Sequence, residues 1–542
     1  MPKRLGAAML LASLVAACSP APSTPAPPPI APGTVQLDPV TLSLLPGETA
    51  TVYASKAGDP GFTDFAWKQD GLDVRTDGHA AEVTAQARPG LYDIVVDAGD
   101  GPDGTVHVTV RAPGQTADVD ARQDVLAEGR AVRSARRPTT GGLYLSAIQQ
   151  TVISWMGEEG HPYVAAYDHT RGAWSEPTRI GTNPDPDYHN YPVLAETADG
   201  HLLAAYGAHD TPLRVARSEK PGSIEGDWTS TTAAAAPASS YPFPFRAADG
   251  RIFIFYRETL DRIDSQYLDD DRPLRYVVSA DNGITWRNSN ELTDDLFALG
   301  SVDRVDNLDE IYVGQVRYLP ATGTRRERVL ISWTIAGGGA DDNKHDRYHR
   351  NMYVTYFRPY DLHFESVAGK DLGTQLANDE MEADCKVLDT GEPRFAMDSD
   401  DFDTHDVDYV SVVDERADGK PVVMFTMFDG ENLITHYDVW TGTAWQDKTG
   451  DFGQPTDMEL RGSVLQAYVS DPGQYESWVM TGDDETFEPG VVHRFNESKA
   501  KNGIETLITN YRQPLQFISG GRGFEDVSDA SPELDVGVIG VP

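Results

Sequence analysis

Two histidines stand at equal distances from one turn signal. Asp199-Gly200 separates two runs of strand-forming residues, and His189 and His209 each lie ten positions from Asp199. An Asp-Gly pair between two such runs is typical of a β-hairpin turn. Opposed residues of antiparallel strands have Cβ atoms about 5 Å apart, so a fold at Asp199 predicts two neighbouring imidazoles.

A second hairpin repeats this arrangement with a phenol and a guanidinium group. Its turn is Asp249-Gly250, and Tyr241 and Arg257 each lie eight positions from Asp249. We therefore expect these two side chains to be opposed across the open end of the hairpin. If the two hairpins are the same part of adjacent repeat units, all four side chains converge on one face. Each residue alone is more often a packing residue, but the symmetry about two successive turns favours a shared site.

These four groups suit the removal of a proton next to a uronate carboxylate. Arg257 can neutralise that carboxylate, because its planar fork binds carboxylates in bidentate fashion and stays charged. A neutral histidine, with an ordinary pKa of about 6.5, can take the proton, and a second histidine or a tyrosine can protonate the leaving oxygen. The sequence leaves open which of His189, His209 and Tyr241 is base and which is acid. This chemistry requires no metal and no redox cofactor.

Short strands must position these residues. Residues 141–542 show no long helical periodicity but many strand-like runs that end in Gly and Asp turns. Successive tryptophans at strand ends are separated by about 55 residues or by three times that interval. A spacing of about 55 residues suits one four-stranded propeller blade. They are Trp174, Trp228, Trp286 and Trp445. The expected fold is all-β, with a seven-bladed β-propeller over residues 141–542.

One of these blades contains a known type of turn. Residues 279–286, SADNGITW, resemble the Asp-box of sialidase-type propellers. Asp281 is expected to bond to the turn backbone and Gly283 to take a positive φ. The segment therefore indicates architecture and not catalysis.

The chain before the propeller divides into four expected segments. Residues 1–18 are typical of a lipoprotein signal peptide whose lipobox ends at Cys18, residues 19–34 of a Pro-rich linker, residues 35–111 of a small immunoglobulin-like β-sandwich, and residues 112–140 of a second linker. Lipidation of Cys18, followed by Ser19, predicts an outer-membrane lipoprotein held by lipid without a spanning helix. The alternative is an ordinary signal peptide with an incidental cysteine.

The charge of the chain excludes one class of partner. Asp and Glu number 85 against 45 Lys and Arg, a formal net charge of −40. Such a chain is unsuited to nucleic acid. If the substrate is itself an anionic polysaccharide, the few cations must be concentrated at the places that bind it. Oligomeric state is not indicated by the sequence.

The segments DYHNYP, YGAHD, SYPFPF and FYRE, each hairpin pair joined by DG, resemble the seven-bladed propeller lyases of the ulvan lyase type. The resemblance extends with gaps over most of residues 141–542. It implies endolytic β-elimination next to glucuronate or iduronate in a sulfated rhamnose polysaccharide. It further implies proton transfer by His189, His209 and Tyr241, carboxylate binding by Arg257, and substrate contacts from Asn190, Tyr312 and His349.

Two departures and several alternatives accompany this resemblance. The sandwich at 35–111 is not part of the lyase pattern, and the acidic stretch 261–271 directly follows Arg257. Related propellers act on rhamnosyl-glucuronate ends, some by hydrolysis. A non-catalytic carbohydrate-binding surface lipoprotein would use the same residues only for binding. A sialidase is a weaker alternative, because no set of three clustered arginines is evident.

Structural metals are a further hypothesis. His345, His363 and Cys385, with His349 nearby, are residue types that bind zinc, although their spacing matches no strong signature. Acidic turns such as residues 398–401, DSDD, have ligands suited to calcium. Burial as a small hydrophobic residue is the commoner role for a lone cysteine such as Cys385.

Overall fold

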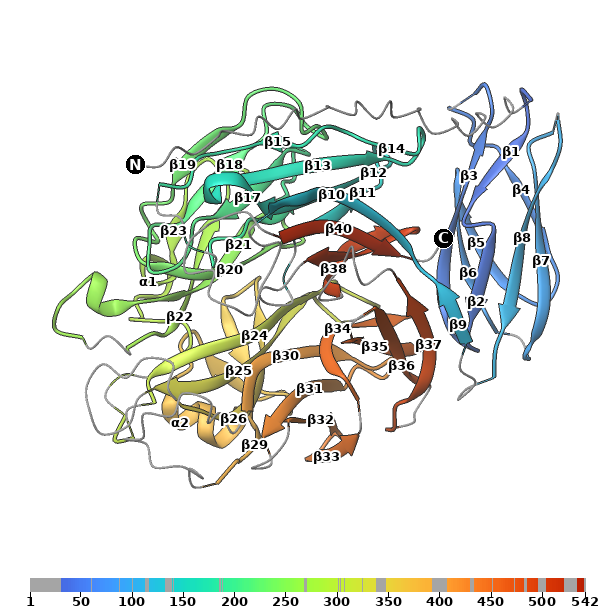
Figure 1. The fold of residues 1–542 in the computed structure, drawn as a ribbon. Coiled ribbons are helices and arrows are strands. Elements are labelled where there is room, and N and C mark those ends of the chain that lie inside the picture. Colours follow the sequence, from blue (N-terminus) through green and yellow to red (C-terminus); the bar gives the residue numbers. More distant parts are fainter. Residues whose placement is uncertain are drawn as a thin grey trace, which may run out of the picture.

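The computed structural model of the chain describes residues 31–540 except 60, 87, 100, 113–116, 132–138, 140, 185–186, 188, 268–270, 301, 303, 307, 324, 338–347, 392–406, 429–432, 451, 472, 482–484, 496–503 and 521–533. At a few strand ends beside these gaps only the backbone is described. The described residues are almost all in strands and turns (Figure 1). None of the helices among them is long and apolar enough to cross a membrane.

The N-terminal unit is a sandwich of two four-stranded sheets. One sheet has the order β1(Val35–Asp38)-β3(Thr49–Lys56)-β6(Ala80–Thr84)-β5(Asp73–Asp77), and the other β2(Thr41–Leu44)-β8(Gly104–Val110)-β7(Gly90–Asp97)-β4(Ala66–Gln69). Inward side chains of both sheets, such as Val52, Val83, Ile94 and Val106, form one buried core. Buried positions alternate with more exposed ones along β3 and β8, as expected for strands with one face on the core and the other in solvent. The immunoglobulin-like class of this sandwich stays a prediction.

The rest of the chain forms consecutive sheets of short antiparallel strands. Four-stranded sheets are β16(Val193–Glu196)-β17(Leu202–Tyr206)-β18(Arg214–Arg217)-β19(Thr229–Thr232), β20(Ser239–Arg246)-β21(Ile252–Glu258)-β22(Leu274–Ser279)-β23(Arg287–Asn288), and β30(Val407–Glu415)-β31(Pro421–Phe428)-β32(Leu433–Trp440)-β33(Trp445–Gly450). A six-stranded sheet comprises β24(Glu310–Leu319), β25(Arg328–Gly337), β26(Tyr348–Arg358), β27(His363–Glu365), β28(Asp371–Gly373) and β29(Lys386–Leu388). Short helices α1(Ser289–Thr293) and α2(Asn378–Glu380) lie in connections.

Two further sheets complete this body and join the ends of the chain. A five-stranded sheet is β34(Gln454–Arg461)-β35(Val464–Asp471)-β36(Gln474–Thr481)-β37(Glu488–Arg494)-β9(Ala117–Asp120). A nine-stranded sheet combines β10(Arg122–Ala131)-β40(Leu534–Gly540)-β39(Leu515–Gly520)-β38(Ile504–Arg512) with β11(Gly142–Leu145)-β12(Gln150–Met156)-β13(Pro162–Asp168)-β14(Ala173–Trp174), and β15(Thr178–Arg179) also pairs with β13. The parallel pairing of β38 with β11 brings the last strands beside the first ones. A seven-bladed arrangement requires this pairing, and the blade number itself stays a prediction.

The segment expected as a linker at 112–140 contributes two strands. β9 pairs in parallel with β37, and β10 pairs antiparallel with β40. Both partner strands lie more than 350 positions further along the chain, so no local sequence pattern predicts these pairings. The N-terminal strand β10 completes the last four-stranded run as its outermost strand.

The first strands of successive sheets lie next to one another. β11 contacts β16, β16 contacts β20, β24 contacts β30, β30 contacts β34, and β34 contacts β38. Residues at the ends of these strands are therefore brought together although they are distant in sequence. This arrangement positions the candidate site.

The Asp-box turn has the expected structure. Asp281 accepts hydrogen bonds from the Thr285 amide at 2.8 Å and the Thr285 hydroxyl at 2.6 Å, and Gly283 has φ 85°. Trp286 packs on the hydrophobic core beneath the turn. The segment thus serves the architecture, as predicted.

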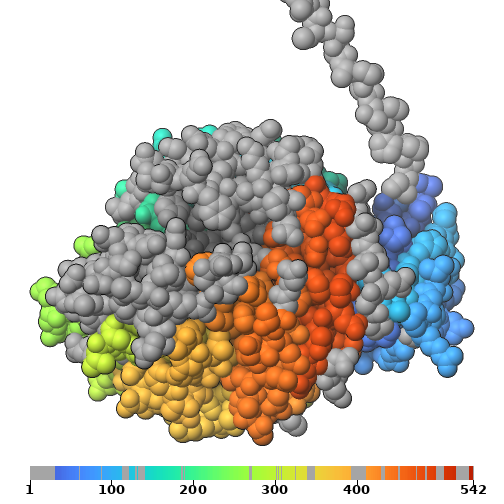
Figure 2. All heavy atoms as spheres, turned by 60° about the horizontal axis from the view of Figure 1, so that its bottom comes forward, coloured from blue at the N-terminus to red at the C-terminus, as the bar shows by residue number. Residues whose placement is uncertain are grey.

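The sandwich is docked on the propeller-like body through ionic contacts. Figure 2 shows it, in blue, beside the orange strands of the five-stranded sheet. Glu48, which is only 2% exposed, accepts hydrogen bonds from Gln466 at 2.6 Å and from the Leu45 amide at 2.8 Å and pairs with Arg461 at 3.2 Å. Asp38 pairs with Arg512 at 3.3 Å. Because Glu48 is buried at this junction, removal of one partner of its ion pair leaves an uncompensated group there.

We predict that Glu48→Gln destabilises the protein by about 1–3 kcal/mol, because Arg461 loses its carboxylate in a buried setting. The loss is measured as a lower midpoint in thermal or urea unfolding of the full chain. Glu82→Gln, at an exposed position of β6, is the matched control and should unfold like the parent protein. Equal midpoints for the two variants would show that the junction is not held by this contact.

Candidate active site

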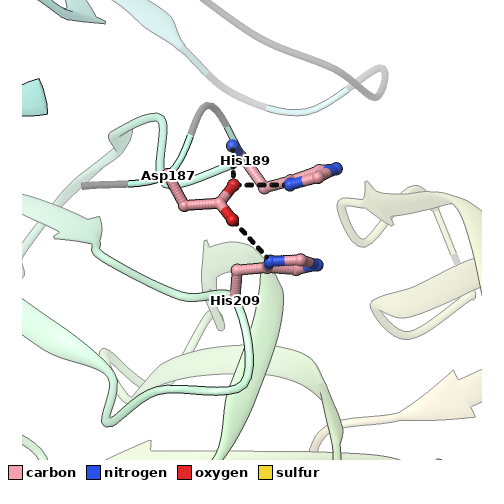
Figure 3. Close-up of side chains that lie close together, drawn as sticks. All are labelled: Asp187, His189 and His209. Carbon is pink, nitrogen blue, oxygen red and sulfur yellow. Dashed lines mark hydrogen bonds and ion pairs between the residues drawn. The ribbon is translucent and has the colours of Figure 1, made fainter. Parts of the chain in front are cut away.

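A carboxylate joins two stacked imidazoles at the ends of β16 and β17. Asp187 Oδ1 lies 2.5 Å from His189 Nδ1, and Asp187 Oδ2 lies 3.0 Å from His209 Nδ1 (Figure 3). The two ring centroids are 3.9 Å apart, with an interplanar angle of 25°. Both rings extend from Asp187 in the same direction (Figure 3). Each Nδ1 donates to the carboxylate, so each Nε2 is presented away from it.

The hairpin register predicted from the sequence produces this pair. β16 pairs with β17 from Val193↔Ala205 to Glu196↔Leu202, and continuing that register places His189 opposite His209. The expectation of neighbouring imidazoles is confirmed by the ring contact.

Asp187 was not among the residues predicted from the sequence. Its carboxylate also accepts the His189 backbone N–H at 2.7 Å, which closes a tight loop of the kind that Asp side chains form with the residue two positions on. The Asp-x-His spacing was the available signal. Burial alone would raise the pKa of Asp187, but hydrogen bonds from His189 and His209 hold it well below its usual range.

A β-bulge places Tyr241 beside the histidines. Ser240 pairs with Arg257 and Phe243 with Phe255, so Tyr241 and Pro242 together oppose Tyr256. The predicted direct opposition of Tyr241 and Arg257 is therefore wrong by one residue. Tyr241 has φ 56°, and its ring lies 5.9 Å from the His189 ring and 6.0 Å from the His209 ring.

Arg257 lies against the same cluster in spite of this shift. Its guanidinium carbon is 5.1 Å from the Tyr241 ring centroid and 4.5 Å from that of Tyr312. The side chain is only 2% exposed, and Nη1 pairs with Glu310 at 3.3 Å. Among the described residues, no group hydrogen-bonds to its Nε or Nη2. A buried guanidinium with free donors is suited to receive an incoming carboxylate.

Electrostatics keep Arg257 fully charged. Burial alone would lower its pKa, but Tyr312, Tyr241 and Glu310 raise the pKa above its ordinary value. The positive charge in this wall of the site does not depend on pH.

Asp210 anchors the segment that carries His209. It has φ 53°, its carboxylate accepts from the hydroxyls of Ser240, at 3.2 Å, and Thr259, and it pairs with Arg272 at 3.5 Å. Burial alone would raise the pKa of Asp210, but the charges of Arg272 and Arg257 hold it below its usual range. The position of His209 therefore depends on the adjacent sheet.

The other predicted substrate-binding residues lie at different depths. Tyr312, at the start of β24, lies 6.5 Å ring to ring from Tyr241. His349 is completely buried behind Tyr312, with ring centroids 4.5 Å apart, and its Nδ1 is 3.1 Å from the Thr334 hydroxyl. Asn190 is buried, and its backbone N–H donates to the Asp187 backbone carbonyl at 3.0 Å. Tyr312 thus belongs to the cluster, while His349 and Asn190 support it from beneath.

The described residues contain one group with the donor types for a metal ion, namely Asp187, His189 and His209. The Nδ1 atoms and carboxylate oxygens of this group are joined by hydrogen bonds, an arrangement that serves proton transfer. Zinc or calcium at the other predicted positions stays a prediction. His345, the turn at 398–401 and Cys18 lie outside the described residues. His363 pairs with Asp371 at 2.9 Å, and burial raises the pKa of the Cys385 thiol to about 12.

Comparison with known proteins assigns the family. Residues 150–451 match the sequence model of the BNR repeat-containing family. That span is more than half of the chain, and it contains the complete cluster just described. The protein therefore belongs to the BNR repeat-containing family.

Several individual proteins to which the chain is similar are ulvan or polysaccharide lyases. The chain is 22% identical over 408 residues to the ulvan lyase of Alteromonas sp. (strain LOR), covering 68% of this chain and 78% of that protein. It is 22% identical over 285 residues to the ulvan lyase PL25 of Pseudoalteromonas sp. (strain PLSV), covering 46% and 52%. A solved PL25 ulvan lyase superimposes with a TM-score of 0.57 at 17% identity, covering 77% of this chain and 96% of that one. The polysaccharide lyase Uly1 superimposes with a TM-score of 0.50 at 10% identity, covering 78% and 100%. The propeller-like fold of these proteins is thus the fold of this chain, as predicted.

We predict that Asp187→Asn disturbs the proton arrangement of the two imidazoles. An amide oxygen replaces only one carboxylate oxygen as acceptor, and the amide nitrogen donates, so one ring must change its tautomer or lose its bond. Long-range ¹H–¹⁵N NMR of histidine-labelled protein measures this: two rings protonated at Nδ1 in the parent and one in the variant. Unchanged tautomers in the variant would show that Asp187 does not set them.

Proposed function

We propose that this protein is a polysaccharide lyase that cleaves a uronic-acid-containing, ulvan-like polysaccharide by β-elimination. The observation that carries the proposal is the convergence of two Asp-linked imidazoles, a phenol and a buried guanidinium in one cluster. The ulvan lyases to which the chain is similar support the substrate class.

Arg257 binds the uronate carboxylate in this proposal. A second negative charge on the carbon next to a carboxylate is unfavourable unless the carboxylate is neutralised. The free Nε and Nη2 donors of Arg257 match two carboxylate oxygens. Tyr241 and Tyr312, which stand over the same guanidinium, form the walls that hold the sugar ring.

The two imidazoles and the Tyr241 phenol carry out the proton transfers in this proposal. One neutral imidazole takes the C5 proton through Nε2, and the electron pair of the C5–H bond forms the C4–C5 double bond while the C4–O4 bond breaks. The departing O4 takes a proton from Nε2–H of the other ring, in its imidazolium form, or from the Tyr241 hydroxyl. Asp187 acts as a positioning residue, because its carboxylate fixes the outward Nε2 of both rings and stabilises the imidazolium that forms.

The geometry favours elimination over hydrolysis. Glycoside hydrolases commonly use a protonated carboxylic acid together with a second carboxylate. The two carboxylates beside the histidines, Asp187 and Asp210, both have pKa values held below their usual range. They are ionised acceptors tied to histidine, hydroxyl and arginine partners, so neither supplies a general acid.

We further propose that the enzyme is exported and held at the outer membrane through a lipid on Cys18. The support is the sequence of residues 1–18, a charged start, a short apolar run and small residues before the cysteine. Such a location places a polysaccharide-degrading enzyme where its large substrate is found.

We predict that incubation with ulvan produces an unsaturated uronate with ultraviolet absorbance at each new chain end. The measurement is a panel of uronate polysaccharides followed by absorbance and by reducing-end assay. New reducing ends without the chromophore would overturn the lyase proposal in favour of a hydrolase, and binding without either product would favour a carbohydrate receptor.

We predict that His189→Ala and Asp187→Asn each lower kcat on the cleaved polysaccharide by about 10²–10⁴-fold, the usual contribution of acid–base catalysis. KM should change little for Asp187→Asn, since this residue acts on the imidazoles and not on the sugar. His201→Ala is a matched control, because His201 lies at the turn of the same hairpin, where its Nδ1 is 2.8 Å from the Ser218 carbonyl oxygen. Parent-like rates for His189→Ala would refute the assignment of the site.

A further inference from the structure

A second polar cavity lies between the sandwich and the propeller-like body. Its volume is about 190 Å³, it is open to solvent, and none of its lining residues belongs to the histidine cluster. The sandwich contributes strands β2 and β3, and the other side comes from the five-stranded sheet and from the β38–β39 turn. The cavity thus exists only because the two units are docked.

The lining reverses the charge of the protein. Arg111, Arg461 and Arg512 face the cavity, and Glu48 is the one acidic residue that lines it. Over the whole chain, acidic residues outnumber basic ones by 85 to 45. Asp38, beside the cavity, pairs with Arg512. A concentration of guanidinium groups in so acidic a chain indicates a place for an anion.

Two nearly buried side chains in the wall retain unused polar atoms. Arg512, 6% exposed, stacks on Tyr53 at 3.9 Å, and His493 is 8% exposed. Within the described part of the chain, neither Arg512 Nε nor His493 Nδ1 has a hydrogen-bond partner. Buried polar atoms are normally satisfied, so these two atoms require a partner such as water or a bound group in the adjacent cavity.

The remaining lining suits a sugar. Hydroxyl and amide side chains surround the guanidinium groups, and Tyr53, Tyr468 and Tyr511 also line the cavity. Burial lowers the pKa of His493 to about 3, with Arg111 and Arg461 acting in the same direction, so this histidine is neutral. It adds a hydrogen-bonding group for hydroxyls and no charge.

We propose that this junction cavity is a second glycan-binding site, which takes one acidic sugar residue through its carboxylate or sulfate group. The identity of the glycan rests on the proposed function, but the anion chemistry does not. The sandwich then has a role in holding the polysaccharide in addition to spacing the enzyme from its anchor.

Ser43→Glu tests the proposal. Ser43 is an exposed residue of β2 that lines the cavity, and a carboxylate there would occupy the guanidinium groups from within the chain. Thr76→Glu, at an exposed position of β5 outside the cavity lining, adds the same charge to the same unit and is the matched control.

The first measurement is affinity electrophoresis of the full chain in gels containing ulvan, with His209→Ala as the common background so that the polymer is not cut. We expect Ser43→Glu to weaken retardation at least threefold and Thr76→Glu to leave it unchanged. Equal retardation of the two variants overturns the proposal.

The second measurement needs no polysaccharide. Sodium glucuronate and sodium sulfate, added separately, should raise the melting temperature of the Thr76→Glu variant more than that of Ser43→Glu, and neutral rhamnose should raise neither. If only glucuronate raises the melting temperature, the cavity is a carboxylate site. If only sulfate raises it, the cavity is a sulfate site. A rise that is equal in both variants contradicts the proposal. Lyase activity on short oligosaccharides is measured in parallel on the parent protein, which keeps His209: its absence with anion binding retained refutes the proposed function and not this cavity.

Discussion

The site is organised by one ionised carboxylate that accepts hydrogen bonds from two imidazoles. Asp187 can hold His189 and His209 at once only because the rings are stacked and both Nδ1 atoms face it. That condition fixes the two Nε2 atoms on the opposite side, where the proposed mechanism requires the substrate proton. The hairpin register, the loop at 187–190 and the anchoring of Asp210 all serve this one geometry.

The backbone around the site is bent to reach it. Tyr241 and Asp210 both have positive φ, a conformation that costs a residue other than glycine about 1–3 kcal/mol. The Asp210 carboxylate, bonded to Ser240, Thr259 and Arg272, offsets part of that cost. The bulge at Tyr241 turns its ring toward the imidazoles, and a regular strand would not place it there. Two of the irregular backbone positions among the described residues thus lie at the candidate site.

The sequence predicted the strands, the Asp-box turn and the proximity of His189 and His209, because turn residues and equal spacing define a hairpin register locally. It could not predict the bulge, since β20 and β21 are buried along almost their whole length and show no alternation in which an extra residue would be visible. Asp187 was missed because a loop carboxylate has no periodicity, and its role appears only when both rings are in place. The strands β9 and β10 were missed because their partners are at the far end of the chain.

The account is tested most directly by a crystal structure of the His209→Ala variant with a bound uronate oligosaccharide. It predicts the uronate carboxylate within hydrogen-bond distance of Arg257 Nε and Nη2, the ring against Tyr241 and Tyr312, and C5 facing His189 Nε2. An oligosaccharide whose carboxylate lies away from Arg257, or whose C5 faces away from the histidine position, would contradict it.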